Sequence, residues 1–262
     1  MIPYIELPSL PIFGNLAIQP FGILLASGIF FGVRRIQQKA QQRGYNVDSV
    51  MTCVHYSMIP GFIGAYVLEI LLYEPMKIFE QGLAAFSSPN LSSYGGLFTS
   101  VLGYLYYQKK FKPKNIPLLT DILLEGAVIG FTLGRLGCGI VHDHPGIASN
   151  FFLAVNYPDM PRHDLGLYEF FFLGFIVLPL SLKISKLYTE KKVPAGVQTS
   201  MMLLLYPPVR FCLEFLRADA SIAGDTRYLG LTPAQYFSIL FFGFGVFWTK
   251  KILTTHSQLN PK

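Results

Sequence analysis

One short run of the sequence carries most of the groups that could do chemistry. Residues 134–146 read Gly-Arg-Leu-Gly-Cys-Gly-Ile-Val-His-Asp-His-Pro-Gly. Arg135 lies inside an apolar segment, where an unpaired charge is costly, so we expect a bound partner. The planar donor fork of a guanidinium suits a phosphate or a carboxylate. The glycines of the run would let a bulky headgroup approach the backbone closely. The alternative is a helix-packing surface of small residues, with an arginine that extends to water.

The other reactive side chains of this run allow three interpretations. His142 or His144 could act as a base, because an imidazole titrates near neutral pH. Cys138 and His142 are four residues apart and would share a face if the helix continued, which would suit a thiolate nucleophile and a covalent lipid intermediate. Together with Asp143, these side chains could also bind zinc. A rigid turn at His-Asp-His-Pro-Gly and a cysteine that only packs are simpler accounts, so we expect no metal.

The elements that position this run are membrane helices. Apolar residues make up 52% of the 262-residue chain, and only 14% are charged. Several apolar stretches approach the length of about 20 residues that crosses a bilayer. We therefore predict an all-α integral membrane protein, with residues 1–262 as a single membrane domain and a small extracytoplasmic head at about 142–165. The seven predicted transmembrane helices are 16–33, 50–73, 97–107, 116–141, 167–182, 197–216 and 233–248.

The positive charges predict how the chain is oriented. Most of its 21 Lys and Arg residues follow the first, third, fifth and seventh predicted helices. The positive-inside rule then places the amino terminus outside and the carboxyl terminus in the cytoplasm. The net charge of +6 is explained by these basic residues on the cytoplasmic side, so we expect no nucleic-acid partner. The reactive run lies at the outer face, where lipid is the expected substrate.

Four motifs together resemble one family. The run at 134–146 is similar to Gly-Arg-x-Gly-Asn-Phe-x-Asn-x-Glu-x-x-Gly of prolipoprotein diacylglyceryl transferases. Residues 94–97 are similar to that family's His-Gly-Gly-Leu, and 162–169 to its Arg-His-Pro-x-x-Leu-Tyr-Glu. Residues 210–217 are similar to its Arg-Phe-x-x-Glu-Phe-x-Arg. The motifs occur in the family's order over nearly the whole chain, and seven helices with an outer amino terminus are also what that family has.

This resemblance implies an enzyme of the bacterial cytoplasmic membrane. Its substrates would be phosphatidylglycerol and the signal peptide of a prolipoprotein, whose lipobox cysteine receives the diacylglyceryl group. It implies no cofactor, and we expect a monomer. Carried over by position, the residues that bind the lipid phosphate and headgroup are Arg135, Arg217, Gly134, Gly137, Gly146, Gly95 and Gly96. The supporting residues are Arg210, Glu214, Arg162, Tyr168 and Glu169.

Departures from the family's pattern are concentrated at the positions that carry its chemistry, and Phe21 stands where the family has a tyrosine. Tyr94 replaces the histidine commonly assigned as the base, Cys138 replaces the asparagine, and Asp143 replaces the glutamate. A phenol with an ordinary pKa of about 10 is a poor base near neutral pH. Our candidate catalytic residues are therefore His142, His144, Asp143, Tyr94 and Cys138. Two alternatives are transfer to another acceptor and a non-catalytic phospholipid-binding protein. A transporter with a broken helix is a third, which the apolar cytoplasmic halves of the predicted helices disfavour.

Overall fold

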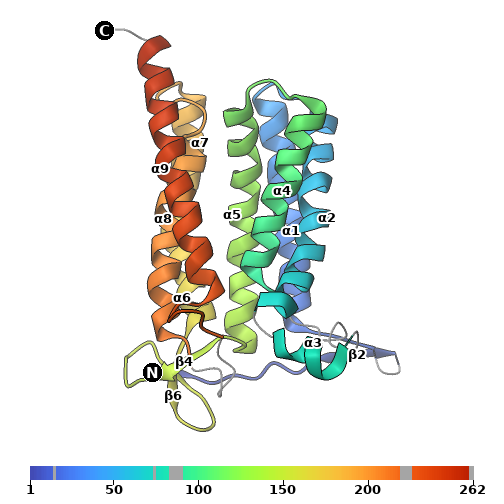
Figure 1. Cartoon of the computed structure of the whole chain (residues 1–262), viewed down its shortest axis with the longest axis vertical. Coiled ribbons are helices and arrows are strands. Elements are labelled where there is room, and N and C mark those ends of the chain that lie inside the picture. The colour runs from blue at the N-terminus through green and yellow to red at the C-terminus, as the bar shows by residue number, and fades with distance from the viewer. Residues whose placement is uncertain (14–15, 73–74, 83–90, 219–225, 260–262) are drawn as a thin grey trace.

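The protein is an elongated bundle of helices with a small head at one end, as the computed structural model shows (Figure 1). The structure describes residues 1–262 apart from 14–15, 73–74, 83–90, 219–225 and 260–262. The elements of the bundle are α1 (Pro20–Gln42), α2 (Val47–Leu72), α4 (Ser93–Phe111), α5 (Ile116–Val141), α6 (Leu165–Phe172), the π-helical turn η2 (Leu173–Val177), α7 (Leu178–Thr189), α8 (Val197–Leu213), the 3₁₀ turn η3 (Glu214–Leu216) and α9 (Pro233–Leu259).

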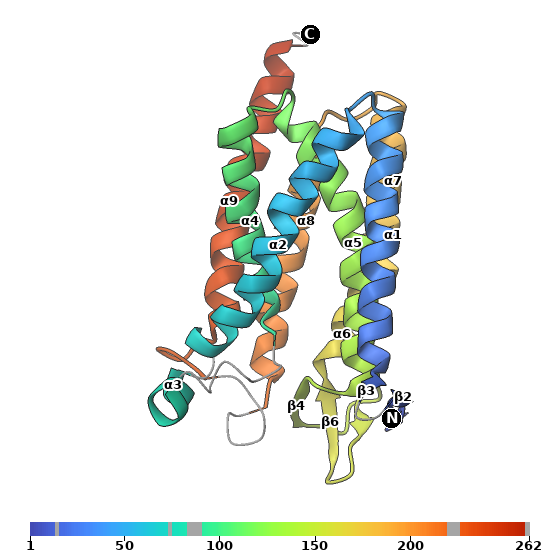
Figure 2. The same cartoon turned by 90° about the vertical axis from the view of Figure 1, so that its right-hand side faces the viewer.

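The head combines segments that are far apart in the sequence. A four-stranded sheet has the order β1-β5-β6-β4 and joins the amino terminus to the predicted head at 142–165. Strand β1 pairs with β5 in parallel, and the other pairs are antiparallel. These strands are β1 (Ile2–Pro3), β4 (Pro145–Ala148), β5 (Val155–Asn156) and β6 (Pro161–Asp164). The hairpin of β2 (Leu10–Phe13) with β3 (Leu16–Ile18) and the short helix α3 (Pro75–Gln81) lie at the same end (Figure 2).

Within the described residues, four helices are long and apolar enough to cross a membrane. They are Val47–Leu72, Ile116–Val141, Leu165–Thr189 and Pro233–His256. Helices α1, α4 and α8 run alongside them in the bundle (Figures 1 and 2). The third of the four is continuous from α6 through the π-helical turn into α7. The structure is therefore mostly helical, with the membrane character that the composition predicted.

Several predicted helix ends were wrong. Residues 16–18 form strand β3 rather than the start of a helix, and α1 begins at Pro20, whose fixed φ and missing N–H suit a first helical position. The helix predicted at 97–107 extends to Ser93–Phe111, because Ser92 caps its start with an oxygen that accepts from the backbone N–H of Gly95. Helix α2 ends at Leu72, and residue 73 lies outside the described residues.

Glycines bring α1 and α5 into close contact. A Cβ atom at Gly126 of α5 would lie 2.3 Å from the carbonyl oxygen of Gly32 on α1. A Cβ atom at Gly28 would lie 2.9 Å from the carbonyl oxygen of Gly130. Small residues at such positions let two membrane helices approach backbone to backbone. This contact fixes α5, which carries the reactive run, against the first helix.

Replacing Gly126 by alanine should lower stability by roughly 1–3 kcal/mol, because the added methyl group forces the two backbones apart. Thermal unfolding of the purified protein in detergent measures the effect. The matched control is Gly243→Ala on α9, where a Cβ atom meets nothing within 4 Å. An equal unfolding temperature for both variants would show that the α1–α5 contact is looser than the structure places it.

Acidic residues of α5 hold the bundle together at the end opposite the head. Asp121 accepts hydrogen bonds from the backbone N–H groups of Gly196 and Thr199, at 2.7 and 2.9 Å, and so caps the start of α8. Glu125 pairs with Arg35 at 3.3 Å and with Arg43. Helix α5 is thereby tied at this end to both the first helix and α8.

Candidate active site

The centre of the site is a buried group of four charged side chains, which we call the charged core: Arg135, Glu169, Arg210 and Glu214. Glu169 is fully buried on α6 and lies between two arginines. Its Oε2 atom is 3.1 Å from Nε of Arg135 on α5, and its Oε1 atom is 3.3 Å from Nε of Arg210 on α8. Arg210 also pairs with Glu214, as their four-residue spacing predicted. The charges of the core therefore balance.

Arg135 keeps part of its donor capacity for a ligand. Its Nη2 atom donates to Oγ of Ser93 at 3.1 Å, and its guanidinium lies over the ring of Phe131, 5.4 Å from the centroid. Its Nη1 atom is buried and has no hydrogen-bond partner within the described part of the chain. A buried donor without a partner is costly, and binding an anion would remove that cost.

Arg217 adds a further positive charge beside this core. It directly follows the 3₁₀ turn that ends α8, is 8% exposed, and forms a backbone bridge with Gly146. The side chain of Asp143 feels both Arg135 and Arg217 electrostatically. Partial burial raises the pKa of Asp143, but neighbouring His144 and the two arginines outweigh this effect, so the pKa lies below its ordinary value. The structure therefore gathers both predicted phosphate-binding arginines at the head end of α5.

Three further side chains of the reactive run converge next to Arg135. The ligand atoms of Cys138, Asp143 and His144 lie within 4.8 Å of one another. Nδ1 of His144 is 2.9 Å from Oδ1 of Asp143, and His144 also lies close enough to Glu169 to affect it electrostatically. Cysteine, aspartate and histidine are all ligands of zinc, so this cluster could hold a metal ion.

His142 points away from that cluster and is built into the head. Helix α5 ends at Val141, and His142 adopts a left-handed conformation with φ of 53°, so the helix does not continue far enough for Cys138 and His142 to share a helical face. Nδ1 of His142 donates to Asp164 at 2.6 Å, and the ring of Tyr4 stacks on the imidazole. Tyr157 donates to the same carboxylate at 2.9 Å.

Replacing Asp164 by alanine should lower stability by roughly 2–4 kcal/mol. Asp164 accepts the bonds from His142 and Tyr157, and it also caps α6 through the backbone N–H of Leu167 at 2.9 Å. Limited proteolysis of the head measures the change, with Glu80→Ala as a control at an exposed carboxylate of α3, at the same end of the protein. Equal protection of both variants would contradict the role of Asp164.

Tyr94 lies at the edge of the charged core and faces α9. Its hydroxyl is hydrogen-bonded to Ser238 at 2.7 Å, and its ring stacks on Phe237 with 5.9 Å between centroids. Arg135, Arg210 and Glu169 all lie within electrostatic range of the phenol. Tyr94, which stands at the position of the family's histidine, therefore borders the site, but its hydroxyl is hydrogen-bonded to the neighbouring helix α9.

Most of the glycines predicted to admit a headgroup serve close packing in the structure. Cβ atoms at Gly95 and Gly96 would meet Leu68 and Ala65 of α2, at 2.8 and 3.1 Å. A Cβ atom at Gly137 would meet Phe21 at 3.0 Å. One at Gly146 would lie 2.5 Å from the carbonyl oxygen of Leu216, whereas one at Gly134 would meet nothing within 4 Å. Of these five glycines, only Gly134 has open space where a side chain would begin.

Of the remaining supporting residues, Arg162 lies in the head on β6 and Tyr168 lies on α6. Nε of Arg162 binds Asp159 at 3.1 Å, and the hydroxyl of Tyr168 is hydrogen-bonded to Nδ1 of His163 at 2.8 Å. Burial lowers the pKa of His163, because it disfavours the charged imidazolium. Sequence reasoning missed Tyr206, which donates to Glu169 at 2.5 Å. Its position one helical turn before Arg210 was the only available signal.

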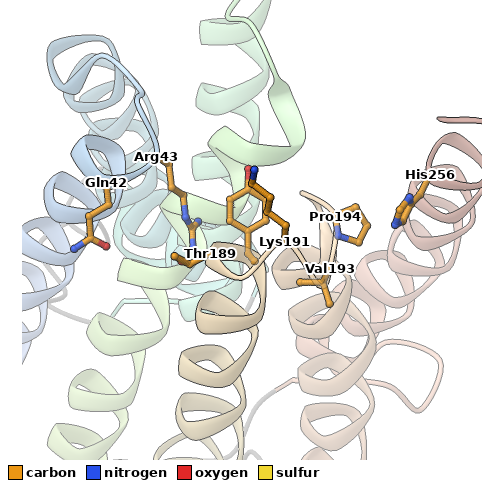
Figure 3. Close-up of a pocket in the computed structure, with 8 residues that line it drawn as sticks. Gln42, Arg43, Thr189, Lys191, Val193, Pro194 and His256 are labelled. Carbon is orange, nitrogen blue, oxygen red and sulfur yellow. The ribbon is translucent and has the colours of Figure 1, made fainter. Parts of the chain in front are cut away.

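A pocket of about 360 Å³ lies at the opposite end of the bundle, where α1, α7 and α9 end (Figure 3). Its residues include Arg43, Lys191 and His256. Arg43 is already held by Glu125 and Ser185, and its guanidinium lies over the ring of Tyr188. The other residues that line the pocket are Gln42, Tyr188, Thr189, Val193 and Pro194. None of the candidate active-site residues lines this pocket.

Comparison with known proteins places the chain in a family. The model of the family described as prolipoprotein diacylglyceryl transferase matches residues 8–250. The chain belongs to this family. The curated relatives include a phosphatidylglycerol–prolipoprotein diacylglyceryl transferase of Rickettsia bellii, which is 27% identical over 89% of this chain and 90% of its own length. Proteins of the same name from Wigglesworthia glossinidia brevipalpis and Rickettsia felis are 22% and 29% identical, over 88% and 75% of this chain and 91% and 75% of their own lengths.

This member of the prolipoprotein diacylglyceryl transferase family is thus a membrane protein of a family of transferases. The region matched by the family model includes the whole charged core, Arg217 and the cluster around Cys138. The family's arginines are therefore present in a buried and organised form, although several of its polar positions carry other side chains.

Proposed function

We propose that this protein transfers a diacylglyceryl group from phosphatidylglycerol to the lipobox cysteine of a prolipoprotein, at the outer face of the bacterial cytoplasmic membrane. The observation that carries this proposal is the arrangement of Arg135. Its free Nη1 donor is buried beside a charge-balanced core, with the added positive charge of Arg217 nearby. Such a site favours an anion, and the lipid phosphate is the anion that a membrane enzyme of this family would encounter.

The reaction displaces a phosphate from carbon. The acceptor thiol gives up its proton to water and its sulfur attacks the glyceryl carbon that carries the phosphate ester, so that a carbon–sulfur bond forms and the carbon–oxygen bond breaks. Its electron pair stays on the departing glycerol phosphate, where Arg135 and Arg217 stabilise the growing negative charge. Glu169 holds Arg135 in position for this role, because its carboxylate fixes Nε and leaves Nη1 for the ligand.

The topology proposed with this function has seven spans, the amino terminus outside and the carboxyl terminus in the cytoplasm. Positive side chains at the end opposite the head support it, including Arg34 after the first span and Lys109 after the third. This orientation puts the charged core near the outer leaflet, within reach of a signal peptide that has been translocated. We propose that the protein acts as a monomer.

A second candidate is a phospholipid-binding protein that lacks turnover. The observation in its favour is the state of Tyr94, which stands at the position of the histidine that the family resemblance implies is the base. The hydroxyl of Tyr94 is hydrogen-bonded to Ser238. Such a protein would bind phosphatidylglycerol through the same arginines and transfer nothing.

A single assay separates the two candidates. Purified protein in nanodiscs containing phosphatidylglycerol is incubated with a peptide that carries a lipobox cysteine, and mass spectrometry of the intact peptide reports added diacylglyceryl. We expect a mass gain that disappears in Arg135→Ala and persists in Arg34→Ala, a matched exposed arginine at the other end of the bundle. A peptide that gains no mass, from a protein that still binds the lipid, would favour the second candidate.

A further inference from the structure

We propose that Cys138, Asp143 and His144 form a zinc site with one open position, at which the metal binds and activates the acceptor thiol. This inference rests on the proposed function, because it supplies the activating group that Tyr94 does not. The ligand atoms of the three side chains lie within 4.8 Å of one another. Three protein ligands plus an open position are the arrangement of catalytic zinc sites.

The turn after α5 creates this cluster. The positive φ of His142 reverses the chain directly after the helix, so that Asp143 and His144 fold back beside Cys138 on the last helical turn. The bonds of His142 to Asp164 and its stacking on Tyr4 hold the turn in place. His142 thus acts as a positioning residue, and the ligands come from the two residues that follow it.

The distances suit a small divalent ion. Zinc bonds of about 2.0–2.3 Å in tetrahedral geometry separate neighbouring ligand atoms by about 3.3–3.8 Å. The cluster needs to contract by roughly 1 Å at its widest separation to reach these values. Nδ1 of His144 already lies 2.9 Å from Oδ1 of Asp143 as an ion pair, so two of the three ligand atoms are held together without the metal.

The types and charges of the ligands favour zinc over a harder metal. A thiolate with an imidazole and a carboxylate selects zinc, whereas magnesium and calcium prefer oxygen ligands alone. A thiolate and a carboxylate together balance the two charges of the ion.

Zinc at this site would take the place of a general base in deprotonating the acceptor thiol. The acceptor thiol binds the open position, a coordinated thiol is deprotonated outright, and its proton passes to water beside Asp143, whose side chain is 42% exposed. The bound thiolate then attacks the glyceryl carbon, and the phosphate leaves with the electron pair toward Arg135 and Arg217. No oxidant or reductant is needed, because sulfur only exchanges a proton for a carbon.

The test measures metal binding and transfer separately. The full-length protein in detergent is stripped with a chelator and titrated with zinc chloride, and bound zinc is measured by elemental mass spectrometry. Cobalt chloride in its place should give the absorption of a thiolate-to-cobalt charge transfer. We expect Cys138→Ser, Asp143→Asn and His144→Gln each to weaken zinc binding by more than about 100-fold, since even outer partners of a metal site contribute about 10–100-fold. The controls are Cys212→Ser and His55→Gln, at an exposed cysteine and an exposed histidine.

Folding is monitored in the same samples, because a variant could fail for structural reasons. Zinc should raise the unfolding temperature of the wild-type protein and of both controls, but not that of the three ligand variants. In nanodiscs, transfer to the lipobox peptide should fall on stripping and return with zinc.

The outcomes separate the two proposals. Zinc bound through these three side chains, with no transfer in any metal state, would uphold the site and overturn the proposed function. Transfer that is unaffected by stripping, in protein that binds no zinc, would overturn the metal site and leave the proposed function standing. A diacylglyceryl adduct on Cys138 itself would also overturn the metal site, because the cysteine would then be the nucleophile.

Discussion

Replacing Glu169 by glutamine is expected to destabilise the protein by roughly 3–5 kcal/mol and to abolish transfer. Glu169 is fully buried and is the only described carboxylate that pairs with Arg135, while it also binds Arg210. Removing its charge leaves the core with an excess positive charge inside the bundle, where water cannot compensate. The amide keeps the volume, so packing alone cannot account for the loss. Thermal unfolding in detergent and the lipobox-peptide assay measure the two effects.

A control and a double variant identify the cause. Glu190→Gln removes one partner of an ion pair with Lys192 whose side chains are 35% and 64% exposed, so it should change stability by only about 0–1 kcal/mol. Combining Glu169→Gln with Arg135→Gln restores the charge balance and should recover much of the stability but none of the transfer. If Glu169→Gln behaved like Glu190→Gln, the core would have to be hydrated rather than buried.

Replacing Arg217 by alanine is expected to lower kcat/KM by roughly 100–1000-fold, the range seen when one charge-stabilising donor is removed from an active site. Arg217 lies at the head end of the charged core and, like Arg135, acts electrostatically on the carboxylate of Asp143. Because its charge stabilises the departing phosphate more than the bound lipid, kcat should fall along with kcat/KM, with little change in KM. Steady-state transfer rates over a range of phosphatidylglycerol content measure both constants.

Arg227→Ala provides the matched control for this prediction. Arg227 lies at the same end and donates to the backbone oxygen of Glu214 at 3.2 Å, so its loss should change the rate only a few-fold. The backbone bridge between Arg217 and Gly146 does not depend on the side chain and should survive the substitution. A rise in KM at unchanged kcat would show instead that Arg217 only helps to bind the lipid.

The composition and the apolar stretches were enough to predict a helical membrane protein. They also located most helices, because crossing a bilayer requires long apolar segments regardless of their neighbours. Helix ends were harder to predict. The strand at Leu16–Ile18 is paired with Leu10–Phe13, and such a pairing has no signature in the hydropathy of either segment. The added sheet strand at Ile2–Pro3 depends likewise on a partner more than 150 residues away.

The site also combines contacts that could be predicted from the sequence with contacts that could not. The Arg210–Glu214 pair could be predicted because both residues lie on one helix at a fixed spacing. That Glu169 links Arg135 to Arg210 could not, because it depends on how α5, α6 and α8 pack. The roles of Gly95 and Gly96 differed from expectation for a related reason, since a glycine admits a neighbouring helix as readily as a ligand.

The sequence by itself determined the class of protein, the family resemblance and the residue types at the reactive run. Only the tertiary structure decided which of those residues act together. It turned His142 into the head and brought Asp143 and His144 back to Cys138. The physical reason is that a single left-handed residue after a helix redirects every following side chain, and tertiary contacts such as those of Asp164 and Tyr4 select that conformation.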